Sequence, residues 1–111
     1  MRLYFERTDG VVVVTSCARV DGSNAKAFEN VLRKIVQESD RALIIDFGPL
    51  KYISSTGLRA ILVTARELSA QAVGFGICAL GAPIRRVFSI GVDKVVAVYE
   101  TKEEAVAAFS A

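Results

Sequence analysis

Hydrophobic residues recur along the chain with two spacings, one typical of strands and the other of helices. Apolar runs of strand length occupy residues 11–15, 42–47, 73–80 and 95–99, and a segment of alternating character covers residues 2–8. Asp9-Gly10 joins the alternating segment to the first run, which predicts a β-hairpin. The run from Ala42 to Phe47 is apolar at nearly every position, as expected for a parallel strand covered on both faces.

Helical spacing occurs between these runs. The apolar stripe of the first predicted helix is Phe28, Val31, Leu32 and Ile35, and that of the second is Leu58, Ile61, Leu62, Ala65 and Leu68. A short third helix is predicted to begin at Gly81-Ala82-Pro83, to use Ile84, Val87 and Phe88 as its inner face and to end at Gly91. Thr101-Lys-Glu-Glu104 fits the capping box of a last helix, which Val106 and Phe109 would dock.

The predicted elements therefore follow the order β-β-α-β-α-β-α-β-α in one domain over residues 1–111. Successive strand–helix–strand units require right-handed crossovers. We predict an α/β fold with a single mixed β-sheet, part of it parallel, and about four helices packed on it.

Composition narrows the classes of function. Hydrophobic residues make up 52% of the chain and charged residues 23%, which is typical of a folded globular domain. The net charge is +2 and the two signs are interleaved, so neither a nucleic-acid surface nor a polybasic membrane anchor is expected. Charges within the first seven residues argue against a signal peptide, and we expect a cytoplasmic protein.

The chain contains no histidine, which removes histidine-based hydrolases, histidine metal sites and phosphohistidine carriers. The spacing of Cys17 and Cys78 matches no metal or redox motif, and both are expected to be buried reduced thiols. We therefore predict a protein that is not an enzyme, with no catalytic residues, no metal site and no cofactor.

Unusual chemistry is concentrated between Asp46 and Leu58, where a Gly-Pro turn leads into three consecutive hydroxyl residues. With Ser54 as the N-cap of the second helix, Ile53 and Leu58 occupy the two positions of a hydrophobic staple. Ser54 then caps the helix, whereas Ser55 at the first helical position can point outward. Asp46 is expected to accept hydrogen bonds from N–H groups of the turn.

Gly57 costs about 1 kcal/mol relative to alanine within a helix, so we expect it to serve something other than helix stability. Without a side chain, it would leave the helix start open to the backbone of a partner. Arg59 lies four residues after Ser55, on the same helical face.

A phosphate on Ser55 would lie at the positive end of the helix, with Arg59 within reach. Such a phosphate should change what the helix start binds without unfolding the domain. Two alternatives remain: Ser54, Ser55 and Thr56 are only caps and polar turn residues, or the helix start binds a free anion.

The motif from Asp46 to Leu58, with a buried strand before it and an amphipathic helix after it, resembles the signature of the STAS domain family, the anti-sigma factor antagonists. The N-terminal hairpin, Val20-Asp21 and the segment 81–88 are similar to features of the same family. The resemblance implies a protein-binding module in a partner-switching pathway. Unphosphorylated, such a module binds an anti-sigma factor that is also a serine kinase, and phosphorylation releases it until a serine phosphatase restores it.

The resemblance implies Ser55 as the phosphate acceptor, with Ser54 and Thr56 as alternates; Ser54 stands where the family usually has aspartate. Together with the spacing argument for Arg59, the predicted partner-binding residues are Asp21, Ser54, Ser55, Thr56, Gly57, Leu58 and Arg59. Other proteins of this fold suggest an alternative, a scaffold subunit of a stress-signalling complex or a sensor of small ligands or anions. A monomer or weak dimer is expected.

Overall fold

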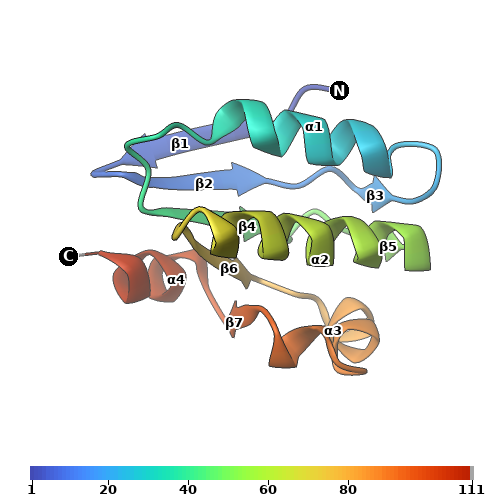
Figure 1. Cartoon of the computed structure of the whole chain (residues 1–111). Coiled ribbons are helices and arrows are strands. Elements are labelled where there is room, and N and C mark those ends of the chain that lie inside the picture. Colours follow the sequence, from blue (N-terminus) through green and yellow to red (C-terminus); the bar gives the residue numbers. More distant parts are fainter. Residues whose placement is uncertain (111) are drawn as a thin grey trace.

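The apolar runs form a five-stranded β-sheet in the computed structural model, which describes residues 1–110 (Figure 1). The strands are β1 (Tyr4–Thr8), β2 (Val11–Thr15), β4 (Ala42–Asp46), β6 (Gly74–Cys78) and β7 (Ala97–Tyr99), in the spatial order β1-β2-β4-β6-β7. β1 is antiparallel to β2 and the remaining pairs are parallel. The predicted mixed sheet is therefore confirmed.

The hairpin turn lies where the sequence predicts it. Thr8 pairs with Val11, so Asp9 and Gly10 form a two-residue turn. Both have positive φ angles, 51° and 81°, which is the backbone of the turn type that suits the twist of a hairpin.

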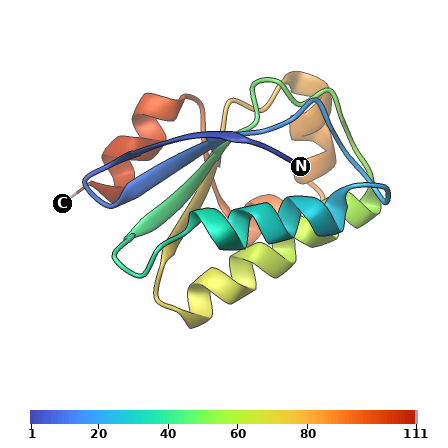
Figure 2. The same cartoon turned by 90° about the horizontal axis from the view of Figure 1, so that it is seen from above.

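Helices cover both faces of the sheet (Figure 2). Helices α1 (Ala25–Ile35) and α2 (Ser55–Ala70) lie side by side on one face, and α4 (Lys102–Phe109) lies on the other. Successive side chains of β4 point to opposite faces of the sheet. Leu43 and Ile45 belong to the core under α1 and α2, whereas Ala42 and Ile44 belong to the core under α4. Hence the four apolar residues of β4 are fully buried between the two helical layers, as predicted, and only Asp46 at its end is half-buried.

The connection from β6 to β7 contains α3 (Ala82–Phe88) and a short 3₁₀ helix, η1 (Val92–Lys94). Phe88 anchors α3, with its ring centroid 5.7 Å from that of Phe47 after β4. Two boundaries differ from prediction. Helix α3 ends at Phe88 with Ser89 as its C-cap, and Gly91 is instead the N-cap of η1. The last strand begins at Ala97 rather than Val95, because the amides of Val95 and Val96 bond back to the Val92 carbonyl of η1.

A second, two-stranded sheet was not predicted. β3 (Arg19–Val20) runs parallel to β5 (Tyr52–Ile53), outside the main sheet and beside the first turns of α1 and α2 (Figure 1). We call this pair the β3–β5 ribbon. It joins the loop before α1 to the loop before α2, and so it places the candidate site.

The buried stripe of α2 also differs from the predicted one. Its buried residues are Gly57, Ala60, Ile61, Thr64 and Leu68. The predicted Leu58, Leu62 and Ala65 are half-buried at its margin, as Val31 is on α1. The helix is therefore rotated toward its small residues, which lets it approach the sheet and the ribbon closely.

Candidate functional site

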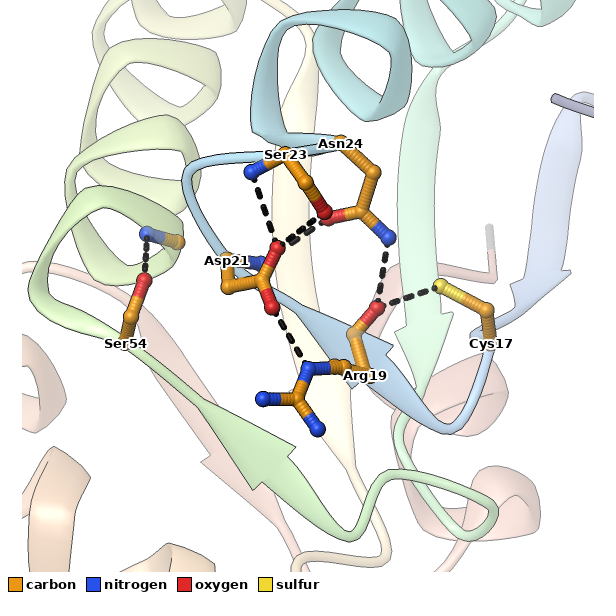
Figure 3. A network of polar contacts seen from close by, with 7 residues as sticks. Cys17, Arg19, Asp21, Ser23, Asn24 and Ser54 are labelled. Carbon is orange, nitrogen blue, oxygen red and sulfur yellow. Dashed lines mark hydrogen bonds and ion pairs between the residues drawn. The ribbon is translucent and has the colours of Figure 1, made fainter.

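The site lies where the two strands of the ribbon lead into α1 and α2. Val20 pairs with Ile53, so the next residues, Asp21 and Ser54, are neighbours across the ribbon. The amide of Ser54 donates to the carbonyl of Val20 at 3.0 Å. Residues that lie 33 positions apart in the sequence are thus brought together (Figure 3).

Ser54 is the N-cap of α2, as predicted. Its side-chain oxygen accepts from the amide of Gly57 at 3.2 Å, and its carbonyl accepts from the amide of Leu58 at 2.9 Å. Ile53 is buried and Leu58 packs against the same core, as a hydrophobic staple requires. The Ser54 hydroxyl is therefore committed to the helix start.

Ser55 and Thr56 form the exposed part of this helix start. Both are exposed, and Ser55 is the first residue of α2. Within residues 1–110, neither hydroxyl has a hydrogen-bond partner. Arg59 is exposed as well, one turn further along. An incoming group can therefore reach the Ser55 oxygen without displacing an internal contact.

Gly57 does not face a partner, and the prediction of an open backbone there is wrong. Gly57 is buried, and a Cβ atom added to it would lie 2.6 Å from the carbonyl oxygen of Val20 and 2.7 Å from Cγ1 of Ile53. The glycine is required because α2 crosses the ribbon at this point. Gly57 thus contributes to the site by allowing the first turn of α2 to pack closely against the ribbon.

Asp21 organises the turn between β3 and α1 (Figure 3). Its carboxylate accepts from the amide of Ser23 at 2.9 Å, from the Ser23 hydroxyl at 2.6 Å and from Nε of Arg19 at 2.5 Å. The Ser23 hydroxyl and the Arg19 guanidinium together lower the pKa of Asp21 to about 2. Asp21 is therefore ionised at neutral pH and rigidly held.

Asn24 completes the turn. Its side-chain oxygen accepts from the Asp21 amide at 2.9 Å, and its side-chain nitrogen donates to the Arg19 carbonyl at 2.8 Å, an acceptor shared with the Cys17 thiol. Sequence reasoning missed Asn24, although an asparagine just before a helix is a common turn signal.

Two further residues of the site were missed, Arg19 and Tyr52. They lie opposite each other in the ribbon, with the guanidinium carbon of Arg19 4.6 Å from the centre of the Tyr52 ring. Tyr52 is 46% exposed, which is high for an aromatic side chain. No local pattern identifies this pair, because its contact depends on strand pairing across 33 residues.

Other residues singled out in the sequence have structural roles. Asp46 accepts from the amide of Gly48 at 2.9 Å, as predicted. In the segment 81–88, Arg85 pairs with Glu100 on the surface. Cys78 is buried, and burial raises the pKa of its thiol to about 12, whereas Cys17 is only half-buried, contrary to prediction.

A cavity of about 380 Å³ opens between α1 and α2, at the end of α2 away from Ser55. Its floor includes Leu32, Leu43 and Leu68, and Arg33 and Glu67 pair across its rim at 2.8 Å. This hollow is separate from the hydroxyl cluster.

Known proteins resemble the chain over nearly its full length. The family model described as STAS domain matches residues 3–105. BtrV of Bordetella bronchiseptica, whose name describes it as a candidate anti-sigma factor antagonist, is 34% identical over 110 residues, covering 98% of this chain and 95% of that protein. The anti-sigma-F factor antagonist RsfB of Mycobacterium tuberculosis is 30% identical over 98 residues, covering 87% of this chain and 80% of that protein.

Among solved structures, an anti-sigma factor antagonist from Mycobacterium paratuberculosis superimposes with a TM-score of 0.86 at 31% identity, covering 97% of this chain and 92% of that one. Within residues 1–110, every helix is too short or too polar to cross a membrane.

Proposed function

This chain belongs to the STAS domain family, and from that premise we propose that it is an anti-sigma factor antagonist switched by phosphorylation of Ser55. Unphosphorylated, it binds an anti-sigma factor that is also a serine kinase and so frees the sigma factor or another client. Phosphorylated, it dissociates, and a serine phosphatase returns it to the binding state. The names of the two curated relatives support the antagonist role.

We choose Ser55 as the acceptor because the two neighbouring serines have different environments. The Ser54 hydroxyl caps α2, whereas Ser55 is exposed without an internal partner among residues 1–110. Phosphorylating Ser54 would modify the oxygen that accepts from the Gly57 amide, and Thr56 is bulkier at its β-carbon. Phosphorylation of Ser55 would therefore disturb the folded structure less than phosphorylation of Ser54 or Thr56.

The chemistry of transfer belongs to the kinase. The Ser55 oxygen bonds to the γ-phosphorus of ATP, the bond from that phosphorus to the bridging oxygen of ADP breaks, and the hydroxyl proton passes to a base of the kinase. This chain supplies only an exposed hydroxyl. Its product carries about two added negative charges, which weaken an interface that lacks matching cations.

The partner surface in this proposal surrounds Ser55. It comprises the exposed side chains of Thr56 and Arg59, the half-buried Leu58 and the Asp21 turn, with Ser54 at its edge. Gly57 contributes only by shaping the helix start from below.

The test is incubation with the serine-kinase anti-sigma factor of the same genome and ATP, followed by mass mapping. Phosphate should appear on Ser55 and the complex should dissociate. Ser55→Ala should bind the kinase and accept no phosphate, whereas Ser55→Asp should bind more weakly. Ser54→Ala is the matched control, because it removes the cap and leaves the acceptor. Stoichiometric phosphate on the Ser55→Ala protein would refute the assignment.

A second candidate function, sensing of a small ligand, is favoured by the cavity between α1 and α2. Its apolar floor and charged rim suit a small molecule with an apolar body and a polar end. Native mass spectrometry of the purified protein should then show a retained ligand, and Ala70→Trp at the rim should release it. A mass equal to that of the chain alone would exclude a tightly bound ligand.

A further inference from the structure

The β3–β5 ribbon has a buried face and an outer face. Val20 and Ile53 are buried, and side chains alternate along a strand. The residues on either side of them therefore share the outer face, which consists of Arg19, Asp21, Tyr52 and Ser54. Ser55 follows directly at the start of α2.

Arg19 uses only part of its hydrogen-bonding capacity on this face. Its Nε donates to Asp21, and its guanidinium lies over the Tyr52 ring. Within residues 1–110, its two terminal nitrogens have no hydrogen-bond partner, and Figure 3 shows them directed away from the Asp21 carboxylate. These two nitrogens are the ones that form a forked, bidentate contact with a phosphate.

Asp21 does not depend on Arg19 for its position. The amide and the hydroxyl of Ser23 hold one carboxylate oxygen, and the Asn24 side chain fixes the Asp21 backbone. The Arg19 side chain is 65% exposed and stacks on the exposed Tyr52 ring, so it can turn without disturbing the core. The ion pair can therefore exchange one partner while the turn stays folded.

Distance favours the exchange. Ser54 bonds to the carbonyl of Val20, so the start of α2 lies one strand spacing from the end of β3, about 4.8 Å. A dianionic phosphate attracts a guanidinium more strongly than a single carboxylate does.

We propose that Arg19 is the residue that binds the phosphate on Ser55, leaving Asp21 when the phosphate arrives. Phosphorylation would then both add negative charge at the helix start and uncover the Asp21 carboxylate beside it. The partner would meet two changed groups rather than one. This inference rests on the proposed modification of Ser55.

The test compares Arg19 with Arg59, the exposed cation on the helical face of Ser55. Phosphoserine is introduced at position 55 during translation, and the phosphate is titrated by ³¹P NMR in three proteins: otherwise unchanged, Arg19→Gln and Arg59→Gln. Arg19→Gln should raise the second pKa of the phosphate by about 0.2–0.7 pH units, the size expected for an exposed ion pair. Arg59→Gln should raise it by less than Arg19→Gln does.

The Asp21 carboxylate provides a second readout, by ¹³C NMR. Phosphorylation should raise the pKa of Asp21 more in the protein that retains Arg19 than in Arg19→Gln, because only the former has an ion pair to lose. The proposal would be overturned if the phosphate had the same pKa in the Arg19→Gln protein as in the otherwise unchanged one. It would also be overturned if Arg59→Gln had the larger effect on that pKa. No kinase is needed, so this result is independent of whether a kinase modifies Ser55.

Discussion

At the scale of single residues, Gly57 sets how closely α2 approaches the ribbon. Gly57→Ala places a methyl group against the side chain of Ile53 and against the Val20 carbonyl, and the latter is a backbone contact that a side-chain rotation cannot relieve. The gain in helix propensity is about 1 kcal/mol, and overpacking costs typically 1–3 kcal/mol. We expect the variant to be less stable by up to about 2 kcal/mol in urea denaturation.

Gly22 provides the matched control, because a Cβ atom there meets nothing within 4 Å. Gly22→Ala should change the free energy of unfolding by less than about 0.5 kcal/mol. Equal stabilities of the two variants would contradict the close approach at Gly57.

Asp21 makes the stability of the folded protein depend on pH in the acid range. Its folded pKa of about 2 lies below the unfolded value, so its contribution is fully present above about pH 4 and is lost as the pH falls through 2. In melting curves recorded between pH 5 and 2, Asp21→Asn should lose less stability than the parent protein. Asp40, Glu67 and Glu100, whose pKa values are also lowered, account for the remaining loss. If the stabilities of Asp21→Asn and the parent protein fell equally between pH 5 and 2, Asp21 would not be strongly paired.

At the scale of elements, Arg7 joins β1 to the end of α1. Its guanidinium contacts both carboxylate oxygens of Asp40, at 2.8 and 2.9 Å, and donates to the Ile35 carbonyl at 2.6 Å. The Asp40 side chain is fully buried. Removing Arg7 would leave this carboxylate without its charged partner.

Arg7→Ala should therefore destabilise the protein by about 1.5–3 kcal/mol. Arg85→Ala is the control, because the Arg85–Glu100 pair has similar geometry but both side chains are about half exposed or more. Its loss should be below about 1 kcal/mol. Chemical denaturation of both variants measures the difference, and similar losses would refute the role of burial.

Elements with their own local signals were predictable from sequence. β4 carries a continuous apolar run, and the caps at Ser54 and Thr101 depend on residues three positions away. β3 and β5 were not predictable, because two residues cannot display alternation. The separate roles of Ser54 and Ser55 followed from local capping. The contacts of Gly57 and Arg19 required knowing which distant strands pair.

At the scale of the whole molecule, the site is built on the surface of an intact core. Ser55 is exposed and its hydroxyl has no partner among residues 1–110, so a phosphate there breaks no internal contact. We expect phosphoserine at position 55 to change Tm by less than about 4 °C, which corresponds to less than about 1 kcal/mol. Calorimetry of the modified and unmodified proteins checks this, and a large fall would mean that the switch acts by unfolding.

The ribbon also gives the serines a mobility of their own. Amides of Lys51, Tyr52 and Ser54 bond only to carbonyls of Ala18 and Val20, and none bonds to the five-stranded sheet. Opening of the segment before α2 requires that these few bonds break and that Leu50 and Ile53 leave the core, while β4 stays paired on both sides. We expect these amides to exchange with deuterium by local opening, well before those of Leu43 and Ile45. Under the proposed function, Ser55 can then be presented to a kinase by local opening, at a lower free energy than global unfolding.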